Sequence, residues 1–146
     1  MTISSRISYL QDFDTKEKVR FLFDALQDYK NALEREWGAT KADQLISLTF
    51  AVLVIEDGHY YQSEHDLISF LLTPTGVSDM RKKIKEIAAT DNLTGAIAYI
   101  KSGLDRISYG GVSAAMDISI LYFICTGGIT AGRSRLLYNL FDDYFN

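Results

Sequence analysis

The residues best suited to chemistry gather between positions 57 and 65. Asp57, Glu64, His59 and His65 place oxygen and nitrogen donors within this short stretch. Such groups bind divalent cations or exchange protons. A histidine pair that binds zinc from one helix is spaced by about four positions, whereas these two are six apart and flank an expected turn. The histidines therefore favour surface or partner contacts over a metal site.

No other stretch of the sequence carries a recognisable catalytic motif. There is no Gly-x-Ser-x-Gly nucleophile elbow and no phosphate-binding loop, since Gly127-Gly128 is not followed by Lys and Ser or Thr. The single cysteine, Cys125, lies in an apolar run typical of a buried thiol. The acidic pairs at 56–57 and 142–143 are adjacent, and adjacent residues do not face each other on a helix. We expect a protein that is not an enzyme and needs no cofactor.

The element that must position the 57–65 cluster is a helix, a tight turn and a second helix, over residues 40–72. An apolar run from Leu45 to Ile55 ends in Glu56-Asp57-Gly58, and apolar spacing resumes at Leu67. Gly58 can adopt the positive φ that ends a helix. An almost wholly apolar helix is usually central and buried, so we expect this unit to dominate the core.

A second unit, at residues 112–144, repeats the first at one fixed offset. The turn glycine Gly58 is matched by Gly128, and the apolar register is kept. The acidic positions change, because Asp57 is matched by Gly127 and Glu64 by Ser134. The neighbouring Arg133 and Arg135 add positive charge there.

Composition and periodicity predict an all-α protein, with residues 1–146 forming one domain of about seven or eight helices. One proline, 47% hydrophobic residues and 12% aromatic residues favour packed helices over disorder or an all-β chain. Residues 4–37 should form N-terminal helices, with Asp14 and Glu17 as a capping box. Thr40 and Ser78 are candidate caps of later helices.

Charge and hydropathy limit the partners and the location. A net charge of −4 argues against nucleic acid, and the basic cluster at 81–85 is typical of a solvated helix face. The longest apolar run is too short to cross a bilayer, so no membrane partner is expected. One cysteine and no visible signal peptide favour a cytoplasmic location.

The pattern Asp57-Gly58, Tyr60 and Glu64 between two apolar helices resembles the tellurite-resistance TerB family. The resemblance extends in organisation over residues 40–144 and implies an all-helical fold with a twofold internal repeat. It also implies a metal-binding acidic surface formed by the turns of both repeats. Here only the first motif is present, and half a site offers few of the six to eight oxygens that Ca²⁺ takes.

Two functions follow. The first is a non-enzymatic bacterial protein-binding module, an immunity or inhibitor protein that occludes a cognate toxin, such as a basic nuclease domain. The candidate partner-binding residues are Glu56, Asp57, His59, Tyr60, Tyr61, Asp142, Asp143 and Tyr144. The alternative is a TerB-like stress-resistance protein that binds a divalent cation such as Ca²⁺ through Asp57 and Glu64.

Overall fold

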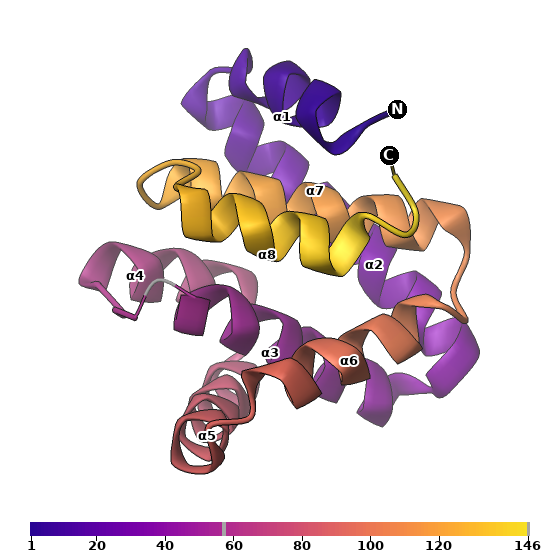
Figure 1. Cartoon of the computed structure of the whole chain (residues 1–146), viewed down its shortest axis with the longest axis vertical. Coiled ribbons are helices and arrows are strands. Elements are labelled where there is room, and N and C mark those ends of the chain that lie inside the picture. Colours follow the sequence, from indigo (N-terminus) through magenta and orange to yellow (C-terminus); the bar gives the residue numbers. More distant parts are fainter. Residues whose placement is uncertain (57, 146) are drawn as a thin grey trace.

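The computed structural model describes residues 1–56 and 58–145, and within them it forms eight α-helices (Figure 1). The helices are α1 (Ile3–Gln11), α2 (Thr15–Trp37), α3 (Ala39–Glu56), α4 (Gln62–Leu71), α5 (Pro74–Thr90), α6 (Leu93–Leu104), α7 (Tyr109–Cys125) and α8 (Ala131–Phe141). No strand occurs in the described residues, so the all-α prediction is confirmed.

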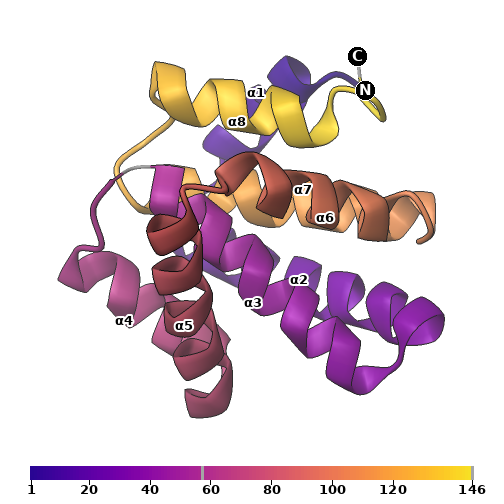
Figure 2. The same ribbon diagram turned by 60° about the horizontal axis from the view of Figure 1, so that its bottom comes forward.

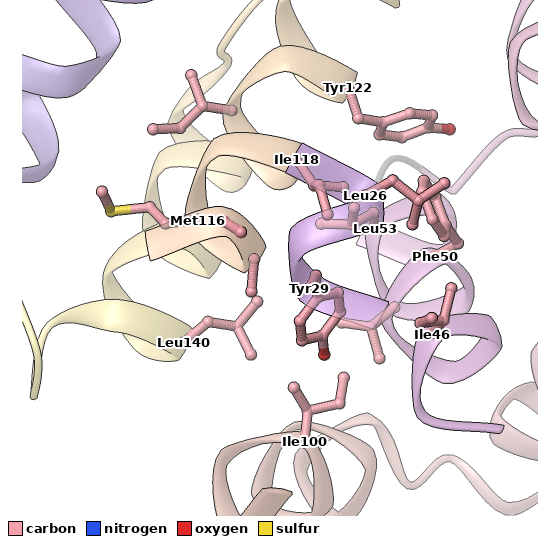
Figure 3. Packing of buried hydrophobic residues seen from close by; sticks show 14 of the residues in the cluster. Leu26, Tyr29, Ile46, Phe50, Leu53, Ile100, Met116, Ile118, Tyr122 and Leu140 are labelled. Carbon is pink, nitrogen blue, oxygen red and sulfur yellow. The ribbon is translucent and has the colours of Figure 1, made fainter. Parts of the chain in front are cut away.

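Helices α3 and α7 form the centre of the molecule, as their apolar sequences predict. In α7, all but one of the side chains from Val112 to Phe123 are buried, and α3 is buried on most sides as far as Val54. Helix α2 packs against both. Figure 3 shows the side chains of Phe50 and Tyr122 among the residues that fill the space between these helices. Their ring centroids lie 6.1 Å apart, and the two rings are nearly perpendicular. One hydrophobic cluster thus receives side chains from all eight helices.

The start of α2 follows the sequence closely. Asp14 accepts a hydrogen bond from the amide of Glu17 at 2.8 Å, and the carboxylate of Glu17 accepts one from the amide of Asp14 at 3.3 Å. This is the capping box that the sequence predicts. It satisfies two amides that a helix start otherwise leaves without partners.

Two other caps were predicted wrongly. Thr40 does not begin α3, because Gly38, at φ 81°, ends α2 and its carbonyl accepts from the amide of Ala42. Ser78 lies within α5, which Thr73 caps by accepting from the amide of Gly76. Proline at the first position of a helix needs no amide partner and has a suitable φ. The proline at position 74 therefore starts α5 after only two residues that follow the end of α4.

The two repeat-like units agree in their helix bounds but differ in packing. Helices α3 and α4 are matched along the chain by α7 and α8. Helix α8 lies along α7 in Figure 1, whereas α4 packs on α5, as Figure 2 shows. The first turn of α4 nevertheless approaches α8, through Glu64 and Arg133.

In the described part of the chain, no helix has both the length and the apolar character that a membrane span requires.

Candidate functional site

The turn between α3 and α4 carries most of the residues that the sequence selects. Helix α3 ends at Glu56, and α4 follows Tyr61, which lies at its N-cap position. Gly58 has φ 69° and donates from its amide to the carbonyl of Ile55 at 3.0 Å. The predicted role of Gly58 is confirmed. Asp57, a candidate for both partner binding and metal binding, lies outside the described residues.

Glu64 is a buried carboxylate, with 1% of its surface exposed. Its Oε2 accepts from the amide of Tyr61 at 2.9 Å, which satisfies a free amide at the start of α4. Its Oε1 lies 3.3 Å from Nη2 of Arg133. Both oxygens of this candidate metal ligand are therefore already bound by groups of the chain itself.

Arg133 is the largest fully buried side chain among the described residues. Its Nη1 donates to the carbonyls of Phe123 at 3.1 Å, Thr126 at 3.2 Å and Gly128 at 2.9 Å. These carbonyls lie at the end of α7 and in the turn after it, where a positive charge also complements the helix dipole. The guanidinium thus connects the turn between α7 and α8 with the first turn of α4.

The acceptors that hold the Arg133 guanidinium include three carbonyl oxygens and a carboxylate oxygen. Hard cations such as Ca²⁺ bind through the same atom types. The guanidinium of Arg133 therefore supplies a positive charge beside the Glu64 carboxylate.

Glu56 lies close to the start of α8. A methyl group added to Gly132 would overlap Oε1 of Glu56, so the absence of a side chain at position 132 allows this approach. Glu56 comes before the connection between α3 and α4, and Glu64 comes after it. Both therefore lie against the first helical turn of α8. The two turns of the repeat meet at one junction.

Tyr60 and His65 support the turn from within. The hydroxyl of Tyr60 lies 3.0 Å from Nδ1 of His65, and Nε2 of His65 lies 3.4 Å from the hydroxyl of Ser69. Burial raises the pKa of Tyr60, and the negative charges of Glu64 and Asp66 add to this, while nearby Arg81 lowers it. The Tyr60 phenol therefore stays neutral at physiological pH and fixes the ring of His65.

His59 and Tyr61 form the exposed part of the same turn. Both side chains are exposed, Tyr61 by 56%, and their ring centroids lie 5.3 Å apart. We call His59, Tyr60 and Tyr61 the aromatic turn. It presents two rings to solvent beside a hydrogen-bonded group in which Tyr60 and His65 are half-buried and Glu64 is buried.

The second group of candidate partner residues lies at the other end of α8. Asp143 forms an ion pair with Lys101 at 3.1 Å, and the hydroxyl of Tyr144 donates to the carboxylate of Asp105. Burial raises the pKa of Tyr144, and the two nearby carboxylates raise it further. Asp142 is exposed. These contacts hold the C-terminal segment against α6. The ion pair with Lys101 explains why an acidic side chain at position 143 stabilises the fold.

The structure does not bring the two groups together. The 11 residues of α8 lie between them, which corresponds to about 16 Å at 1.5 Å per residue. The aromatic turn and the 142–144 segment are therefore separate surfaces.

Sequence reasoning missed the role of Arg133. It treats this residue only as extra positive charge beside the second turn. The available signal was its position one residue before Ser134, the counterpart of Glu64. In the repeat alignment, Arg133 is therefore a long, positively charged side chain next to the position that corresponds to Glu64.

No group of three or more His, Cys, Asp or Glu side chains in residues 1–56 and 58–145 lies close enough to hold a metal ion. Burial raises the pKa of the Cys125 thiol, which favours the unreactive protonated form.

Comparison with known proteins gave no match: none among protein-family models, none among curated proteins and none among solved structures.

Proposed function

We propose that this chain is a non-enzymatic bacterial protein-binding module, an immunity or inhibitor protein that acts in the cytoplasm on a cognate toxin. The observation that carries the proposal is the aromatic turn, where the exposed side chains of Tyr61 and His59 lie beside the hydrogen-bonded residues Tyr60 and Glu64. Tyrosine is enriched among the residues that dominate binding energy at protein interfaces.

The support under the turn favours tight binding. Glu64 fixes the amide of Tyr61, and Arg133 fixes Glu64, so the turn loses little conformational freedom when a partner binds. Rigid anchors improve affinity by lowering the entropic cost of association. This gives the buried ion pair a role in function as well as in stability.

The partner in this proposal is a basic protein, such as the nuclease domain of a toxin. The chain carries a net charge of −4, and complementary charge accelerates encounter and excludes wrong partners. The mechanism is occlusion: the aromatic turn seats against the toxin and blocks access to its active site. The exposed Asp142 could add a second acidic contact.

Growth rescue tests this proposal. Basic proteins encoded beside this chain would be expressed alone and together with it. We expect at least one to stop growth when alone, and co-expression to restore growth. Tyr61→Ala should weaken the rescue, whereas Tyr99→Ala, which removes a tyrosine of similar exposure at 48% on α6, should not. If no neighbouring product is toxic, or both variants rescue equally, the proposal fails.

The alternative function, a divalent cation held by Asp57 and Glu64 as in the TerB-like resemblance, receives less support. A metal ion would have to displace or share the contacts that Glu64 makes with Arg133 and with the amide of Tyr61. Two like-charged groups beside one buried carboxylate would repel each other. A melting experiment with divalent ions tests this alternative function.

A further inference from the structure

Helix α2 carries an exposed row of charges that changes sign at its midpoint. Lys16, Arg20, Asp24 and Asp28 are all exposed and are spaced by four positions, or roughly one helical turn. None of the ion pairs found in the described residues includes any of these four. The neighbouring Glu17 carboxylate accepts a hydrogen bond from the amide of Asp14. From the N-terminal to the C-terminal end of this row, the four side chains are therefore positive, positive, negative and negative.

An exposed apolar surface lies beside this row. Phe23 of α2 is 46% exposed and Phe70 of α4 is 62% exposed, and their rings meet edge to face with centroids 5.7 Å apart. They line a groove of about 680 Å³, which Val19 also lines. Phe23 lies next to the point where the row of charges changes sign. Exposed aromatic pairs of this kind mark association surfaces more often than isolated apolar residues do.

We propose that this surface binds a second copy of the chain, with the two α2 helices antiparallel across a twofold axis between positions 20 and 24. Lys16 then faces Asp28 of the partner subunit, and Arg20 faces Asp24 of the partner subunit. A twofold interface must be complementary to itself, and a row that is positive in one half and negative in the other meets this requirement. A parallel arrangement would place like charges together.

The apolar groove also favours the antiparallel twofold arrangement. With the axis beside Phe23, the Phe23–Phe70 pair of each copy lies close to the axis and leaves solvent. The row of charges then flanks an apolar centre, which is the usual anatomy of a protein interface. This surface shares no residue with the aromatic turn, so it can be tested separately from the proposed function.

Sedimentation equilibrium of the full chain over a concentration series tests the proposal. We expect the mass to rise from 16.4 kDa toward twice that value with concentration. High salt should weaken the association, because exposed charges are screened. A wild-type protein that stays at 16.4 kDa throughout the series would overturn the proposal.

Charge reversal provides the decisive variants. Lys16→Glu with Arg20→Glu gives a row of four acids, and Asp24→Lys with Asp28→Lys gives a row of four bases. Each variant alone should associate about tenfold more weakly or worse, since like charges then face each other. An equimolar mixture of the two should form a heterodimer.

The variant with all four changes inverts the row and should still form a homodimer. It is the matched control, because it carries every substitution of the two weakened variants. Circular dichroism would establish that each variant is folded. A dimer that is unaffected by the double reversals, or two double variants that do not associate when mixed, would overturn the antiparallel arrangement.

Discussion

Replacing Arg133 with methionine would leave a buried carboxylate without its cation. Glu64 and Arg133 are each 1% exposed, and the Nη2–Oε1 distance is 3.3 Å. Removing one partner of a buried ion pair costs about 3–5 kcal/mol, because the other charge remains buried and uncompensated. Methionine also cannot donate to the carbonyls of Phe123, Thr126 and Gly128. We therefore expect the upper part of this range.

Such a loss would be a large share of the total stability, since the free energy of unfolding of a small protein is roughly 5–15 kcal/mol. It corresponds to a fall in melting temperature of about 10 °C or more for a chain of this length. Urea unfolding followed by circular dichroism would measure it directly. The slope of the unfolding free energy against urea concentration should stay unchanged if the native fold is retained.

A double-mutant cycle separates the ion pair from the other contacts of Arg133. Glu64→Gln keeps an oxygen that can accept from the amide of Tyr61 but removes the charge. The double variant Glu64→Gln, Arg133→Met should be more stable than Arg133→Met alone, because no charge then remains buried. A cost of less than about 1 kcal/mol for Arg133→Met, or no recovery in the double variant, would refute this reasoning.

Three further predictions follow from the same structure. In urea unfolding, Gly110→Ala, which has no atom within 4 Å of the added carbon, should stabilise the fold by up to about 1 kcal/mol through helix propensity, and Gly132→Ala should be the less favourable of the two changes, because the Glu56 carboxylate must move away from the new methyl group; equal effects would contradict this packing. Millimolar Ca²⁺, Mg²⁺, Mn²⁺ or Zn²⁺ should leave the melting temperature of the chelator-treated protein unchanged, and a rise that Asp57→Asn abolishes would favour the alternative, metal-binding function. Burial raises the pKa of Asp117 although Arg6 opposes the shift, so the folded state binds this proton more tightly than the unfolded chain does. Its contribution to the free energy of unfolding should therefore fall as the pH rises from about 3.9 through the raised pKa, and urea unfolding of Asp117→Asn should lack that part of the pH dependence.

The sequence predicted the helices well because their signals are local. Apolar periodicity, the Asp14–Glu17 capping box and the turn glycine at position 58 each act within a few residues, and the structure confirms them. The start of α5 differs from the prediction at Ser78 because Pro74 suits the first position of a helix and Thr73 caps it.

The junction of the two turns could not be predicted in the same way. Glu64 and Arg133 are 69 positions apart, and their contact depends on how α8 packs against α3 and α7. Alignment of the two repeats pairs Glu64 with Ser134 and so directs attention away from Arg133. The different packing of α4 and α8 is also a long-range property, since helices with similar apolar faces can pack against different neighbours.

The aromatic turn carries the proposed function, so a direct binding measurement tests the account best. Isothermal titration would compare wild type, Tyr61→Ala and Tyr99→Ala against an inactive form of the toxin identified by growth rescue. We expect nanomolar binding by wild type and Tyr99→Ala, and binding weaker by about tenfold or more for Tyr61→Ala, equivalent to at least 1.4 kcal/mol. Equal affinity of the three proteins would contradict the claim that the aromatic turn is the contact surface.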